Sequence, residues 1–199
     1  MRRVLSLLSL FVLSAGAAAA AGAAPAATMK EGFVSVTTTR GPEKRLDFEV
    51  VVPASLGEVW SAFTTREGME SWIAPQARVR MELGGEWEVG FAGSAPGGGT
   101  VLAWLPMEMI TVHAMAPESF PTVRRERTIA VFRFDPIGEK QTRVRLAQFG
   151  WKEGPEWDKA FDYLAKGNAQ LLNALHRRFT DGPIDWKAIF AKAEKKSGS

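Results

Sequence analysis

The chain has 199 residues, with 25 Lys and Arg against 22 Asp and Glu, and no Cys. This length suits one domain with a sizeable core, and the near balance of charge provides no basic footprint for nucleic acid, so we predict no nucleic-acid partner. Without Cys disulfides are excluded, and with only two His residues a zinc site of the usual nitrogen and sulfur ligands cannot be assembled.

The N-terminus has the three parts of a secretory signal peptide. Arg2 and Arg3 give a positive start, residues 4–13 are apolar apart from two serines, and residues 15–27 are almost entirely Ala and Gly. A membrane anchor would need about 20 strongly apolar residues, far more than this core provides. Residues 1–26 are therefore predicted to be a cleavable signal peptide of the general secretory route, without a lipid-modified Cys. The protein is predicted to be periplasmic or secreted, with no stable membrane span after cleavage.

The first folded residues have the composition of strands. Residues 33–39 are dense in Val and Thr and follow a short polar lead, so residues 27–45 are interpreted as a lead plus an extra strand. Residues 46–52 alternate apolar with acidic side chains, which predicts a half-buried strand.

Two short helices are predicted directly after this strand. Ser55 and Glu58 have the spacing of a capping box, which predicts a helix whose apolar face includes Val59 and Phe63. The sequence Thr-Thr-Arg-Glu at 64–67 repeats the pattern and predicts a second helix that ends near Trp72.

The middle of the chain alternates apolar and charged residues in short segments separated by turn residues. Such segments predict hairpins in series, an antiparallel meander, with flexible loops at 93–99 and 116–121. The predicted strands are residues 78–83, 86–91, 101–105, 109–115, 128–135 and 142–149.

The period then changes to that of a helix. From Pro155, apolar residues recur every three or four positions as far as Phe179, which predicts an amphipathic helix of about 25 residues. Gly182 and Pro183 end it. Residues 181–199 are predicted to form a short helix of a turn or two and a flexible Lys-rich tail.

These elements combine into an α+β fold. One long helix cannot bury its apolar stripe alone, and an antiparallel sheet has one face to bury, so the sheet is predicted to curl around the helix. A space between the concave face and the helix would be the place for a ligand.

The order of elements and several short motifs resemble the START-like (SRPBCC, Bet v-like) superfamily of helix-grip domains. The branch that they resemble most is that of the activator of heat-shock protein 90 ATPase and its bacterial homologues. The resemblance spans residues 46–179, and the motifs are residues 50–55, 58–64, 68–75, 84–87, 132–136 and 142–146. It implies a helix-grip domain over residues 46–180, with a curved antiparallel sheet wrapped around a long C-terminal helix and two short helices after the first core strand.

The aromatic residues are the candidates for lining such a cavity. The chain has 7 Trp and 12 Phe against 1 Tyr, and this favours an aromatic-lined pocket or, as an alternative left open, a filled bulky core. Gln148, where many relatives have His, and Tyr163 are predicted to supply polar groups. The predicted cavity lining is Trp60, Phe63, Trp72, Trp87, Phe91, Trp104, Phe132, Phe134, Gln148, Trp157, Phe161 and Tyr163.

Three functions remain open at this point. The first is non-enzymatic binding of a small hydrophobic molecule such as a lipid, an isoprenoid or an aromatic compound. The second is an enzyme of the cyclase or hydrolase type, which some relatives resemble, but no catalytic residue, metal site or cofactor is predicted. The third is a chaperone-activator-like protein-interaction domain with an unknown partner. The predicted export argues against this last role, because the chaperone and its ATP are cytoplasmic.

Overall fold

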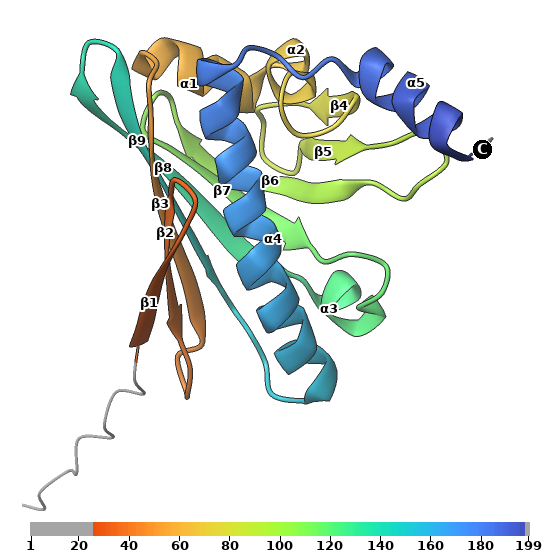
Figure 1. Cartoon of the computed structure of the whole chain (residues 1–199). Helices are drawn as coiled ribbons and strands as arrows, with labels where there is room; N and C mark the ends of the chain where they lie inside the picture. Colours follow the sequence, from red (N-terminus) through yellow and green to blue (C-terminus); the bar gives the residue numbers. More distant parts are fainter. Residues whose placement is uncertain (1–25, 198–199) are drawn as a thin grey trace, which may run out of the picture.

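The computed structural model describes residues 26–197, in which one nine-stranded antiparallel sheet wraps around a long helix (Figure 1). The strands lie in the order β1-β2-β3-β9-β8-β7-β6-β5-β4. Their bounds are β1 Ala26–Glu31, β2 Val34–Thr39, β3 Arg45–Val52, β4 Gln76–Val79, β5 Glu86–Gly90, β6 Gly97–Leu105, β7 Met109–Met115, β8 Thr128–Gly138 and β9 Gln141–Phe149. The helices are α1 Leu56–Thr64, α2 Arg66–Glu70, α3 Pro121–Glu126, α4 Pro155–Thr180 and α5 Trp186–Ser197. The predicted helix-grip arrangement is confirmed.

The predicted signal peptide lies outside the described residues except for Ala26, with which β1 begins. Within residues 26–197, no helix is long and apolar enough to cross a membrane.

The core forms between the concave face of the sheet and α4. In β3 every second side chain is buried, including Phe48 and Val50, because the pleat turns alternate residues towards the helix. The facing residues of α4, among them Phe161, Leu172 and Leu175, are at most 1 % exposed. The helical stripe and the strand alternation therefore meet in one apolar cluster, as their periods predict.

Local capping hydrogen bonds begin the two short helices, as the sequence predicts. The Ser55 side chain accepts from the backbone N–H of Glu58, while the Glu58 carboxylate accepts from the N–H of Ser55 at 2.9 Å. This reciprocal pair begins α1, which buries Phe63. Thr65 Oγ1 accepts from the N–H of Gly68 at 3.0 Å and begins α2.

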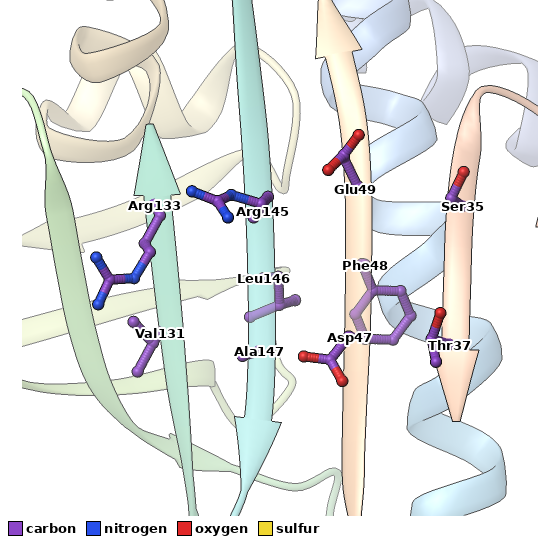
Figure 2. A pocket seen from close by; sticks show the side chains of 10 residues that line it. All are labelled: Ser35, Thr37, Asp47, Phe48, Glu49, Val131, Arg133, Arg145, Leu146 and Ala147. Carbon is purple, nitrogen blue, oxygen red and sulfur yellow. The ribbon is translucent and has the colours of Figure 1, made fainter. Parts of the chain in front are cut away.

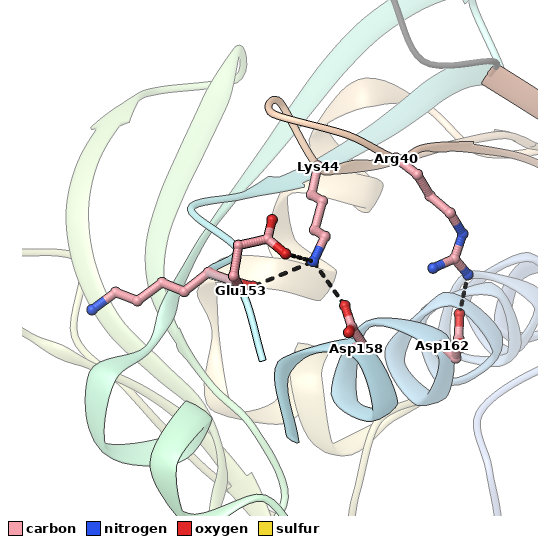
Figure 3. A network of polar contacts seen from close by, with 6 residues as sticks. Arg40, Lys44, Glu153, Asp158 and Asp162 are labelled. Carbon is pink, nitrogen blue, oxygen red and sulfur yellow. Dashed lines mark hydrogen bonds and ion pairs between the residues drawn. The ribbon is translucent and has the colours of Figure 1, made fainter. Parts of the chain in front are cut away.

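Charged contacts attach the N-terminal half of α4 to the turn between β2 and β3 (Figure 3). Lys44 Nζ donates to Asp158 Oδ1 at 2.7 Å and to Glu153 Oε2 at 3.3 Å, and its side chain is 10 % exposed. The hydrogen bond to Asp158 raises the pKa of Lys44 above its ordinary value, against the opposing effect of burial. Arg40 pairs with Asp162 one turn further along α4. These contacts fix where the helix crosses the sheet.

A helix that the sequence did not predict, α3, lies between β7 and β8. Its Val123 is fully buried in a cluster with Trp157 of α4. The Glu156 carboxylate accepts the backbone N–H groups of Thr122 at 2.6 Å and Val123 at 3.1 Å. Burial acts to raise the pKa of Glu156, but these hydrogen bonds outweigh it and hold the pKa below its ordinary value. Because the cap comes from α4, 34 residues away, α3 has no local capping side chain, and Pro121 at its first position is its only local start signal.

The two edge strands are those that the sequence predicted least well. The sequence predicts only a short polar lead for the residues of β1, yet they pair with β2 along their whole length. Most of β1 is exposed, so no alternation marks it. The strand predicted at 78–83 ends at Val79, and Leu83 is 78 % exposed in the turn that follows.

The glycines predicted to form a flexible loop begin β6 instead. A Cβ on Gly99 would lie 2.2 Å from the carbonyl oxygen of His113, and one on Gly98 would lie 2.1 Å from that of Trp87. Gly98 also has a φ of +94°. These glycines let the backbones of β5 and β7 approach β6 closely.

The C-terminal segment is a longer helix than predicted. Asp185 Oδ1 accepts from the N–H of Ala188 and begins α5, which continues for 12 residues. Trp186 Nε1 donates to the carbonyl of Glu70 at 2.6 Å, and the rings of Trp186 and Phe190 pack on Phe91. The helix thus lies against α2 and the loop after β5 (Figure 1).

Candidate functional site

A cavity of about 410 Å³ lies between the concave face of the sheet and α4. The strands from β5 to β9 form its wall on one side and the middle of α4 forms the other. Its lining consists of Ile73, Trp87, Val89, Ala95, Pro96, Gly97, Gly98, Val112, Ala114, Met115, Pro117, Glu118, Arg124, Ala130, Phe132, Leu146, Gln148, Leu164, Asn168 and Leu171. Most of these side chains are apolar, so the space favours an apolar occupant.

Two aromatic residues make the rigid part of the wall. The rings of Trp87 and Phe132 lie 5.5 Å apart between their centres. Trp87 Nε1 donates to the carbonyl of Phe63 at 2.9 Å, which satisfies the indole N–H and fixes the ring. Phe63 in turn packs against Phe132 at 5.1 Å. The wall therefore rests on α1 and cannot easily collapse into the cavity.

Two polar side chains that line the cavity, Gln148 and Asn168, belong to a chain of three hydrogen-bonded side chains. Gln148 Nε2 donates to Thr128 Oγ1 at 2.7 Å, and Asn168 Nδ2 donates to Gln148 Oε1 at 2.7 Å. Gln148 is 3 % exposed and Thr128 is 2 % exposed. The network joins β8 and β9 to α4 and leaves neutral groups beside the apolar wall.

Arg124 of α3 spans the mouth of the cavity. Its Nη1 donates to the carbonyl of Ala116 at 2.7 Å, and its Nη2 donates to the carbonyl of Pro96 at 2.8 Å. These carbonyls belong to the loops before β6 and after β7, so one guanidinium ties the two sides of the mouth together. Glu118, which is exposed, lies on the same rim.

The comparison with protein families assigns most of this fold to one family. The model described as "Activator of Hsp90 ATPase homolog 1-like protein" matches residues 53–180. The chain belongs to this family. The match begins at the residue after β3 and ends with α4, so it contains every element that lines the cavity.

Solved structures of family-like proteins share the fold. The Aha1 dimer from Colwellia psychrerythraea is 19 % identical with a TM-score of 0.56, and the alignment covers 69 % of this chain and 97 % of that one. A protein from Mesorhizobium loti is 17 % identical with a TM-score of 0.58, over 70 % and 99 % of the two chains. CalU16 from Micromonospora echinospora is 17 % identical with a TM-score of 0.53, over 85 % and 92 %. No curated protein sequence matches the chain.

The predicted lining residues divide into several groups in this family fold. Trp87, Phe132 and Gln148 line the cavity. Most of the others fill the core, as the alternative interpretation allowed, or pack partly buried against it. These residues are Trp60, Phe63, Trp72, Trp104, Phe134 and Phe161. Trp157 is buried in the separate cluster beneath α3.

The inward orientation predicted for Phe91 and Tyr163 is wrong. Phe91 is 44 % exposed because β5 ends one residue before it and the ring turns outward to meet α5. Tyr163 is 53 % exposed because it lies on the outer side of α4, where it packs against Phe120. Neither residue reaches the cavity.

The polar lining residues that were not predicted are Glu118, Arg124 and Asn168. Asn168 carries a signal that could have revealed it, because it occupies the helical stripe between Phe161 and Leu172 where an apolar residue is expected. Arg124 carries none, since its position depends on the cap that α4 gives to α3.

The ionisable groups of the cavity are confined to its rim, where Glu118 and Arg124 lie. His113 is half-buried in β7, and His176 Nδ1 bonds to the carbonyl of Val51 outside the cavity. Within residues 26–197, no group of three His, Cys, Asp or Glu residues could hold a metal ion.

A second depression, on the convex face, is an open sheet surface (Figure 2). Glu49 of β3 lies opposite Arg145 of β9, which in turn lies opposite Arg133 of β8. Arg145 pairs with Asp135 at 2.8 Å, which is a cross-strand ion pair of the kind common on solvent faces. The short side chains of Ala147 and Val131 lie next to these long ones and leave the hollow, which is open to solvent and offers no apolar enclosure.

Proposed function

We propose that this chain binds a small hydrophobic molecule in the cavity between the sheet and α4, and that it does so outside the cytoplasm. The observation that carries the proposal is the cavity itself. Its volume of about 410 Å³ lies within the range of small-molecule sites, and its wall is apolar with a few hydrogen-bonding groups at one end. A core that only stabilised the fold would be packed without such a space.

The proposal favours binding over catalysis because of where the charged groups lie. General acid–base chemistry requires an ionisable group within hydrogen-bond distance of the reacting atoms. The polar side chains inside the cavity, those of Gln148 and Asn168, are neutral amides. Glu118 is exposed on the rim, and the guanidinium of Arg124 donates to the backbone carbonyls of Ala116 and Pro96.

The site of action is proposed from the N-terminal sequence. Residues 1–26 have the organisation of a secretory signal peptide: a positive start, a short apolar core and a small-residue end. An exported member of this family would be separated from a cytoplasmic chaperone and its ATP. This favours a small hydrophobic ligand, rather than the chaperone, as its partner.

One experiment tests both the export of the chain and its binding of a ligand. The full chain is expressed in a Gram-negative host, and the periplasmic fraction is analysed by native mass spectrometry. We expect a mature chain that begins close to residue 27 and carries a bound molecule that is released on collisional activation. An uncleaved chain retained in the cytoplasm would contradict the export, and a ligand-free mature chain whose Trp fluorescence no lipid, isoprenoid or aromatic compound alters would contradict the binding.

A matched pair of variants tests whether the ligand binds in this cavity. Ala114 lines the cavity, whereas Ala147 lies on the convex face. Ala114→Phe should fill part of the cavity and abolish the co-purified ligand, and Ala147→Phe should keep it. Equal retention by both folded variants would show that the ligand binds elsewhere.

A further inference from the structure

The charge of Arg124 at the cavity mouth is not balanced by a carboxylate. Both of its hydrogen-bond acceptors are backbone carbonyls, those of Ala116 and Pro96. Within residues 26–197 it takes part in no ion pair, although carboxylates lie nearby in the sequence. The guanidinium has five N–H donors, so the two bonds to the loops leave donors available.

The neighbouring carboxylates have other partners. Glu126 pairs with Lys152 at 2.7 Å and with Arg125 at 3.6 Å. Glu156 accepts the backbone N–H groups at the start of α3. Glu118 shares the rim with Arg124 but is exposed to solvent, which screens its charge.

A cation at the edge of an apolar cavity selects the charge of the ligand. Because the wall has a low dielectric constant, the field of the guanidinium is weakly screened on the cavity side. A guanidinium binds a carboxylate through charge-assisted and often paired hydrogen bonds. The other polar side chains inside the cavity, those of Gln148 and Asn168, are neutral. The cavity is thus apolar along its wall, and its one cation lies at the mouth.

We propose that the ligand is an amphipathic carboxylic acid that enters with its apolar end first. Its carboxylate lies at Arg124 and its apolar body lies against Trp87 and Phe132. This inference rests on the proposed binding function and adds the chemical class of the ligand. It also explains why an arginine ties the mouth loops together, since the residue that closes the site would bind the head group as well.

The test compares three probes that share one apolar chain: dodecanoic acid, dodecanol and methyl dodecanoate. Binding to the mature chain is followed by Trp fluorescence in about 50 mM salt, where screening is moderate. A charged hydrogen bond at a partly buried site predicts that the acid binds about 10- to 100-fold more tightly than the alcohol or the ester. Equal affinities for the three probes would overturn this inference and leave the binding function intact. No binding by any of them, or by other apolar compounds, would count against the binding function itself.

Three variants separate charge from structure. Arg124→Gln should reduce the ratio of acid to alcohol affinity to about one, because looser mouth loops would affect both probes alike whereas the lost charge affects only the acid. Arg125→Gln, on the same short helix but exposed and paired with Glu126, should keep the ratio of the unaltered chain. Glu118→Gln should keep the ratio or raise it. An unchanged ratio in folded Arg124→Gln would contradict the assignment, and if that variant does not fold, the comparison of probes on the unaltered chain decides.

Discussion

At the scale of single residues, the amide of Gln148 joins the sheet to the long helix. It is buried at 3 % exposure, and both ends of its side chain are bonded, to Thr128 and to Asn168. A buried amide without partners would cost more free energy than the bonds return, so the three residues depend on one another. They stabilise the fold, and two of them, Gln148 and Asn168, also line the cavity.

This dependence predicts a non-additive pair of substitutions. Gln148→Leu should lower the free energy of unfolding by about 1–3 kcal/mol, because Thr128 and Asn168 lose a partner in a buried place. Adding Thr128→Val should cost less than the same change in the unaltered chain, since the double variant leaves no unpaired hydroxyl. Urea unfolding of the four proteins measures the coupling. Strict additivity would show that the bond between Gln148 and Thr128 contributes nothing.

At the scale of elements, the start of β6 is set by glycine. Gly98 and Gly99 occur where the backbone carbonyls of β5 and β7 leave no space for a Cβ. The same strand forms part of the mouth of the cavity, so the close approach of three strands shapes the site as well as the sheet.

We expect Gly99→Ala to lower the free energy of unfolding by more than about 2 kcal/mol, because its Cβ would lie 2.2 Å from a backbone oxygen of β7 that cannot move alone. Gly57 is the matched control, since it lies in α1 and a Cβ there would meet nothing within 4 Å. Gly57→Ala should be neutral or stabilise by up to about 1 kcal/mol through helix propensity. Thermal and urea unfolding compare the two, and similar losses in both variants would contradict the steric explanation.

At the scale of the whole molecule, the sequence predicted the elements that bury one face. The alternation in β3, the capping box of α1 and the stripe of α4 are local patterns with a fixed period, and the structure confirms all three. It did not predict α3 or most of α5, because each is held by a partner distant in the chain: Glu156 caps α3, and Phe91 packs on α5. It did not predict β1 because that strand is mostly exposed and has no apolar alternation.

The cavity-lining residues divide in the same way, into those that a local pattern predicts and those that it does not. Alternation placed Trp87, Phe132 and Gln148 correctly on the concave face, but it cannot separate residues that fill a core from residues that border a space. That distinction depends on how far α4 lies from each strand, which no local pattern contains. The rim depends on loop geometry, and therefore Arg124 could be found only in the folded chain.

The sheet is also expected to open in a definite order. Strand β9 lies between β3 and β8 and its Val144 is fully buried, whereas β1 is exposed and pairs on one side only. Hydrogen exchange followed by mass spectrometry should therefore show rapid exchange in β1 and slow exchange in β9.

The tip of the β1–β2 hairpin is held by Asn173 of α4, which accepts from the N–H of Phe33 at 2.8 Å and donates to the carbonyl of Glu31 at 2.8 Å. Asn173→Ala should hasten exchange in β1 and leave β9 unchanged, and equal acceleration in both strands would show that the hairpin opens only with the whole domain.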